Sequence, residues 1–233
     1  MIREGKTVSK KRSYRTLLEA EKVSESNTLR QGADAYWIDL RGADFNNKYL
    51  CGANLSRAKL LGADLRRANF KGANFCGAYF TGAKLSGVWF FEANLSQSDF
   101  TRVKITGGCF ESADLSWANL SAAEFRGSDL TRAILTRAEL TKAKFTEADF
   151  TEAKLTQTRL INTDFTGAIF IEADFSGADF TGANFTGSDC TGAKFTQPIS
   201  MWATVKGLAD VTGLNPAIYL AAEHYREKCI KEH

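Results

Sequence analysis

Apolar residues recur at every fifth position over most of this chain. When residues 36–195 are divided into 32 consecutive blocks of five, the last residue is Leu or Phe in 30 blocks. Two positions earlier, Ala occurs in 22 of the 32 blocks, and most of the other residues there are small. Asp, Asn or Lys usually stands between these two positions, and two mostly polar residues follow. No insertion interrupts this register.

A period of five fits neither common regular structure, because a helix repeats near 3.6 residues and a strand near 2.0. A chain with this period must turn after every block. Leu or Phe and Ala then point inward, and the other three residues of the block point outward. Backbone groups would pair with those of adjacent coils, as buried polar groups must. The pattern therefore predicts an all-β solenoid for residues 36–197.

The blocks Ala-Asp-Phe-Asn-Asn (43–47), Ala-Asn-Leu-Ser-Arg (53–57) and Ala-Asp-Phe-Thr-Gly (178–182) match the motif A(D/N)LXX. Over about two thirds of its length the chain resembles the pentapeptide repeat proteins. The resemblance implies a right-handed quadrilateral β-helix with 20 residues per coil, and hence about eight coils for these 32 blocks. At the usual spacing of neighbouring strands the tower would be roughly 35–40 Å tall.

Both ends of such a tower need covers, because open coil edges fray or polymerise. Residues 1–35 lie outside the repeat and are predicted to form an N-terminal extension and cap. Within them, Thr16-Leu17-Leu18-Glu19 reads as a capping box that opens a short helix. The basic run Lys10–Arg12 precedes it and is interpreted as a solvated tail, with contact to an anionic partner as the alternative.

Residues 198–233 are predicted to form an α-helical cap at the C-terminal end. A first helix is expected near Ser200–Ala209, and a second opens at Asn215-Pro216, an N-cap followed by proline. The second helix carries one apolar stripe: Ile218, Ala222, Tyr225 and Cys229. This stripe packs either on the terminal coil of its own tower or on the same helices of a second chain. The second arrangement would make a homodimer, as in some pentapeptide repeat proteins.

Candidate chemistry is sparse. The five cysteines are scattered without C-x-x-C spacing, and the two histidines, His224 and His233, lie near the C-terminus. We therefore predict no enzyme activity, no cofactor and no metal site, and we interpret Cys190 as a buried core thiol. Ser and Thr follow Leu or Phe in most blocks, which indicates hydrogen bonds in turns rather than an ice-binding face.

The expected location is the cytoplasm of a bacterium. No apolar leader and no run of about 18 apolar residues is visible, so neither secretion nor a membrane span is predicted. Scattered cysteines suit a reducing compartment.

Residues that are 20 positions apart share a face of the predicted tower. The face centred on Leu50, Phe70 and Phe90 is unusual because large apolar residues occupy its outward positions: Tyr49, Trp89, Phe91, Ile169 and Ile171. Exposed aromatic side chains gathered on one side indicate a contact site for a protein partner. The alternatives are that a terminal segment covers them or that they contact nothing.

The predicted function is a non-enzymatic scaffold that binds a protein partner through its flat faces. The alternative is a DNA mimic that binds topoisomerase (gyrase), which is the role of the quinolone-resistance branch of the family. That role requires a strongly acidic tower, whereas residues 36–195 contain 18 acidic and 18 basic side chains. The same balance gives no basis for specific binding to nucleic acid.

Overall fold

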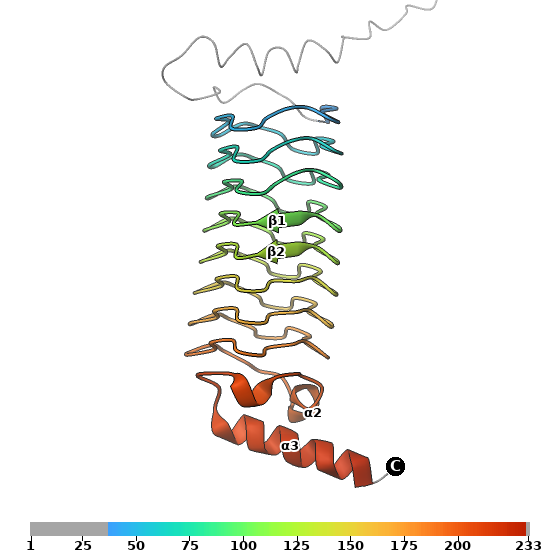
Figure 1. Ribbon diagram of the computed structural model, residues 1–233, viewed down its shortest axis with the longest axis vertical. Helices are drawn as coiled ribbons and strands as arrows, with labels where there is room; N and C mark the ends of the chain where they lie inside the picture. The colour runs from blue at the N-terminus through green and yellow to red at the C-terminus, as the bar shows by residue number, and fades with distance from the viewer. Residues whose placement is uncertain (1–36, 232–233) are drawn as a thin grey trace, which may run out of the picture.

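The computed structural model describes the backbone of residues 37–231 and the side chains of residues 37–228. Over residues 39–194 the chain forms stacked coils, joined by parallel β-bridges between residues 20 positions apart (Figure 1). In two neighbouring coils the pairing extends into short parallel strands, β1 (Lys104–Thr106) and β2 (Glu124–Arg126). The N-terminal helix predicted at residues 16–23 lies outside the described residues.

Hydrogen bonding within block 68–72 explains why five residues suffice for one side of a coil. The N–H of Asn69 donates to the preceding coil (2.8 Å), and those of Phe70 and Gly72 donate to the next coil (2.8 and 2.9 Å). The N–H of Ala68 donates to a carbonyl three residues earlier and closes the turn (3.1 Å). The fifth N–H, of Lys71, donates to the side-chain Oδ1 of Asn69 (2.9 Å). Every N–H of the block therefore has an acceptor, as buried backbone requires.

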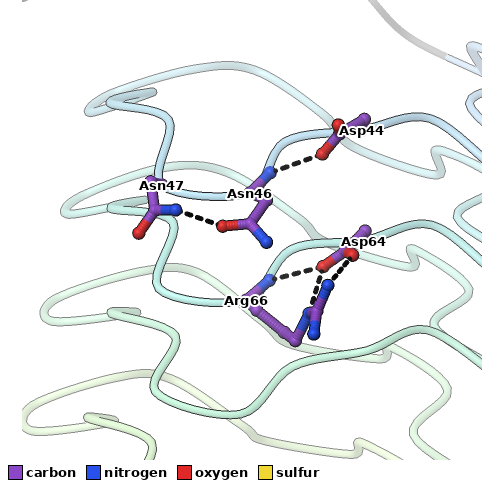
Figure 2. A network of polar contacts seen from close by, with 5 residues as sticks. All are labelled: Asp44, Asn46, Asn47, Asp64 and Arg66. Carbon is purple, nitrogen blue, oxygen red and sulfur yellow. Dashed lines mark hydrogen bonds and ion pairs between the residues drawn. The ribbon is translucent and has the colours of Figure 1, made fainter.

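The fifth hydrogen bond accounts for the Asp and Asn residues of the repeat. Figure 2 shows Asp44 Oδ1 accepting the N–H of Asn46 (3.0 Å) and Asp64 Oδ1 accepting that of Arg66 (3.2 Å). The Arg66 guanidinium also reaches both oxygens of Asp64, with Nε–Oδ1 and Nη2–Oδ2 distances of 2.9 and 2.6 Å. This hydrogen bond from Arg66 lowers the pKa of Asp64 below its usual value.

Threonine hydroxyls join the same hydrogen bonds in the later coils. Thr166 Oγ1 donates to Asp164 Oδ1 at 2.6 Å, and Thr191 Oγ1 donates to Asp189 Oδ1 at the same distance. Hydrogen bonds from Ser176 and Thr191 lower the pKa values of Asp174 and Asp189, respectively. The prediction that these hydroxyls serve the turns is confirmed.

The interior is filled by the repeated Leu and Phe side chains, which are at most 2% exposed between Leu40 and Phe185. Phenylalanines one coil apart stack, as Phe80 and Phe100 do at a centroid distance of 4.4 Å. Where a polar residue replaces Ala, it finds an internal acceptor; Thr158 Oγ1 donates to a carbonyl of the preceding coil (3.1 Å). Burial raises the pKa of Cys190 to about 12, so this thiol is a neutral member of the core, as predicted.

Beyond residue 195 the chain makes one further, irregular coil. Its bridges join Asn184 to Lys206 and Asp189 to Thr212, so the spacing grows from 20 to 22 and then 23 residues. This coil contains helix α2 (Ile199–Trp202) and the 3₁₀ helix η1 (Leu208–Asp210). The Trp202 ring closes the core, with its centroid 4.8 Å from those of Phe180 and Phe195.

The prediction of one helix over Ser200–Ala209 is therefore wrong. Apolar residues at helical spacing are present, but the backbone between α2 and η1 is used to pair with the preceding coil. The Lys206 N–H donates to the Ala183 carbonyl (2.8 Å), and Gly207 adopts a left-handed conformation (φ 74°) that no α-helix interior contains. Inter-coil pairing thus overrides local helical periodicity.

Helix α3 (Pro216–Lys231) begins where the sequence predicts and lies across the end of the tower (Figure 1). Asn215 Oδ1 accepts the Ala217 N–H at 2.9 Å. Ala222 is buried and Ile218 packs partly against the core. The Arg226 guanidinium donates to the carbonyls of Ala203, at 2.6 Å, and Val205. Backbone acceptors at the end of the tower are therefore satisfied by a side chain of α3.

The aspartate turns predict how stability depends on pH. The pKa values of Asp64, Asp174 and Asp189 are lower in the folded chain, so these groups stabilise the fold above the unfolded value of about 4. This stabilisation is lost as the pH falls through the folded pKa values. The melting temperature should be steady above about pH 5 and fall steeply below about pH 4. Asp174→Asn keeps the Oδ1 acceptor and removes the titration, so it should shallow the decline; an unchanged or steeper acid decline would contradict this account.

Gly108 predicts an unexpected response to substitution. It occupies a position where Ala is usual, yet an added Cβ would lie 2.8 Å from both Ile105 Cγ2 and Phe110 Cε2. Because Ile105 is β-branched, its γ-methyl cannot rotate freely away. Gly108→Ala should therefore lower the free energy of unfolding by about 1–3 kcal/mol in a denaturant titration.

The paired substitution tests this cause. Ile105→Leu moves the branch away from Gly108, so the double variant Ile105→Leu/Gly108→Ala should recover most of the loss. Additive losses in the double variant would show that Ile105 is not the obstacle.

Candidate interaction surface

The tower has four faces, each built on one column of bridge residues. Face 1 is the column Asp39, Lys59, Tyr79, Asp99, Asn119, Glu139, Arg159 and Asp179. Face 2 is Asp44, Asp64, Lys84, Lys104, Glu124, Lys144, Asp164 and Asn184. Face 3 is Tyr49, Asn69, Trp89, Cys109, Asp129, Asp149, Ile169 and Asp189. Face 4 is Asn54, Asn74, Asn94, Asp114, Ile134, Lys154, Asp174 and Lys194.

Three of the predicted contact residues lie in the N-terminal part of face 3. Tyr49 and Trp89 are in one column, two coils apart, and are 58% and 56% exposed. Phe91, two residues after Trp89, is only half-buried. The Lys71 ammonium lies 4.7 Å from the centre of the Phe91 ring, a distance that suits a cation–π contact. Together, Tyr49, Trp89 and Phe91 present aromatic surface on a rigid backbone.

Ile169 and Ile171 belong to the same face but lie farther along it. Four coils separate Ile169 from Trp89 in the column, which corresponds to roughly 19 Å. Ile169 is 37% exposed and Ile171 is half-buried. Cys109, Asp129 and Asp149 occupy the column between the two groups. The predicted face therefore consists of two apolar groups at a distance from each other and not of one continuous patch.

Charge differs strongly between the faces, although the tower as a whole is neutral. We count, for each block, the bridge residue and the two outward residues that follow Leu or Phe. On face 3 this set holds seven acidic and two basic side chains, a net charge of −5. Faces 1, 2 and 4 carry +1, +1 and +2. The acidic residues of face 3 are Glu92, Glu111, Asp129, Asp149, Glu152, Glu172 and Asp189.

Other exposed apolar residues escaped the sequence prediction. Trp37 and Trp117 occupy a corner position, where the backbone is left-handed (φ 62° and 61°) and Gly is common. Each carries an arginine from the next coil over its ring: Arg57 at 5.2 Å and Arg137 at 4.8 Å. The available signal was a large aromatic residue at a glycine position. Leu61 and Tyr79 are also exposed, on or beside face 1, opposite face 3.

The apolar stripe predicted for the second C-terminal helix divides between two environments. Ile218 and Ala222 face the tower, whereas Tyr225 is 42% exposed. Cys229 lies within α3, and its side chain is outside the described set. Leu220, which the stripe did not include, is 65% exposed.

Elements of catalysis or metal binding do not assemble in the part of the chain that the structure describes. Residues 37–228 contain no group of three or more His, Cys, Asp or Glu side chains placed to hold a metal ion. Cys51, Cys76 and Cys109 are half-buried free thiols, and burial raises the pKa of Cys109. Among the helices described, none has the length and apolar character needed to cross a bilayer.

The repeat and the coil geometry agree with a known family. The model of the family described as pentapeptide repeats matches the chain in eight copies that together cover residues 36–197. The chain belongs to the pentapeptide repeat family, as the motif analysis predicted. The fold of this family is the right-handed β-helix.

Solved structures of the family resemble this chain at low sequence identity. HetL, involved in heterocyst differentiation regulation in the cyanobacterium Nostoc sp. strain PCC 7120, is 22% identical with a TM-score of 0.52; the match covers 79% of this chain and 86% of HetL. The plasmid-mediated fluoroquinolone resistance protein QnrB1 is 20% identical, with a TM-score of 0.40 and coverage of 75% and 96%. No curated protein sequence gives a significant match. HetL supports the fold alone.

Proposed function

We propose that this chain is a non-enzymatic, cytoplasmic scaffold that binds a protein partner through its flat faces. The observation that carries the proposal is the exposed aromatic group Tyr49, Trp89 and Phe91 on face 3. Coil-to-coil hydrogen bonds fix the backbone beneath these side chains, so little conformational entropy is lost when a partner orders them. Large aromatic side chains on a preorganised surface are the usual anchors of protein interfaces.

The identity of the bridge residues supports this choice. Asp and Asn accept the fifth N–H of the block, but Trp, Tyr and Ile at the bridge position cannot. The N–H of Phe91 therefore has no acceptor on Trp89 comparable to the one that Lys71 has on Asn69. A residue that gives up a local hydrogen bond and exposes a large apolar surface is better explained by a contact than by folding.

The DNA-mimic alternative has less support. It requires acidic charge around the tower, whereas only face 3 has an acidic excess and the other three faces are slightly basic. QnrB1 provides no argument for it at a TM-score of 0.40.

A paired substitution tests the scaffold proposal. Trp89→Ala/Phe91→Ala should abolish capture of the chain's specific partner from native lysate, as read by quantitative mass spectrometry. The matched control is Tyr79→Ala/Thr81→Ala, which changes the same two block positions on face 1. Equal partner recovery by the wild type and the Trp89/Phe91 variant would remove face 3 as the docking surface.

We also propose that residues 198–233 close the C-terminal end of the tower, rather than joining two towers into a homodimer. Arg226 supports this assignment, because it donates to carbonyls of the irregular last coil in its own chain. Arg226→Ala should lower the free energy of unfolding by about 1–3 kcal/mol, because charged hydrogen bonds are lost. Glu227→Ala, an exposed change on the same helix, should have little effect on denaturant unfolding. A dimer by light scattering that dissociates in the Arg226 variant would favour the second-chain arrangement.

A further inference from the structure

Face 3 differs from the other faces in what replaces Asp and Asn in its column. The replacements on face 3 are all apolar or weakly polar: Tyr49, Trp89, Cys109 and Ile169. On faces 1, 2 and 4 the replacements are mostly charged, and Tyr79 and Ile134 are the apolar exceptions in the described columns. The chain therefore concentrates exposed apolar side chains on the face that also carries the acidic excess.

The charge between the two apolar groups is available to a partner. Arg132, one of the two bases of face 3, already pairs with Glu111 at 2.5 Å, and the other, Lys71, lies over the Phe91 ring. Asp129 and Asp149 use Oδ1 to accept the N–H groups of Thr131 and Thr151 (2.9 and 2.8 Å). Among the described side chains, no salt bridge neutralises Asp129, Asp149, Glu152 or Glu172.

The backbone of face 3 leaves a partner only side chains to contact. The N–H of Phe110 donates to the Asp129 carbonyl (2.6 Å) and that of Leu130 to the Asp149 carbonyl (2.7 Å), so these bridges are already paired along the column. Addition of a partner strand by backbone hydrogen bonding, as at open sheet edges, is thus unavailable here. A helix laid along the column can instead contact the face through its side chains.

We propose that face 3 docks a basic amphipathic helix of a protein partner, and this inference rests on the scaffold function proposed above. Apolar side chains near the two ends of that helix contact Trp89 and Ile169. Its Lys or Arg side chains lie over Asp129 and Asp149, with Glu152 and Glu172 at the adjoining corner. The distance of roughly 19 Å between the apolar groups corresponds to about 13 helical residues.

The probe is a fluorescein-labelled amphipathic peptide of about 16 residues, with Leu near both ends and Lys on its polar positions. Binding to the full chain is followed by fluorescence anisotropy at low ionic strength, where surface charges act most strongly. A second probe has Glu in place of Lys, and a third has Ser in place of the terminal Leu residues. The proposal expects the first probe to bind at least about tenfold more tightly than either of the others.

Two variants with equal net charge locate the binding surface. The first neutralises face 3 with Asp129→Asn, Asp149→Asn, Glu152→Gln and Glu172→Gln; asparagine retains the Oδ1 acceptor of the turn. The second neutralises other faces with Asp164→Asn, Asp174→Asn, Glu139→Gln and Glu147→Gln. The face 3 variant should weaken binding of the first probe about tenfold, and the control less than about twofold. Equal weakening in both variants would reveal general attraction and overturn the proposal.

The apolar contacts have a separate readout. Trp89→Ala/Ile169→Ala should weaken binding about tenfold, and this ratio should persist at high salt, which screens only the charges. Should no probe bind while the Trp89/Phe91 variant still loses its lysate partner, the basic helix is wrong and the scaffold function stands. If the probe binds face 3 but the lysate partner does not depend on it, the scaffold assignment fails instead.

One competing occupant is the chain's own N-terminal segment, which contains Lys10, Lys11 and Arg12. A zero-length carbodiimide crosslinker joins an amine to a carboxylate in direct contact. Crosslinks within one full-length chain from Lys10 or Lys11 to Asp129 or Asp149, together with no probe binding, would identify that segment as the occupant. This result would overturn the proposal of an external partner.

Discussion

The fold depends on one constraint: each coil must present its backbone groups in register with the coils above and below it. A single block of five donates one N–H to the preceding coil and two to the next, as block 68–72 shows. This pairing holds only if equivalent residues stand 20 positions apart. The constraint fixes the period, places Leu and Phe in continuous interior columns, and leaves three of five side chains outside. Sequence freedom on the faces follows from strictness in the backbone.

This constraint explains why most of the fold was predictable. A period of five without insertion over residues 36–195 admits few structures, and the position of each side chain, inside or outside, follows from its place in the block. Prediction failed at Ser200–Ala209, where apolar spacing resembled a helix but pairing with the Asn184 coil took precedence. A short apolar segment next to a template of unpaired backbone is governed by the template, and local periodicity does not contain that information.

The candidate surface was predicted only in part. The sequence pattern identified the column of Tyr49 and Trp89, because residues 20 apart must share a face. It did not separate that group from Ile169, since the separation depends on the rise between coils. Total charge also concealed the distribution, because a neutral tower can have one acidic face and three weakly basic ones. Trp37 and Trp117 were missed because aromatic residues at left-handed corners are unusual.

The lengthening of the last coil has a consequence for how such a chain can grow. Duplication of any 20 residues within the regular tower adds one storey and preserves every column, so interior length is open to gradual change. Past Lys194 the bridges span 22 and 23 residues, and a copied storey would no longer align with the columns beneath it. The irregular coil is therefore a terminator of repeat expansion as well as a floor, and new storeys are accepted only above it.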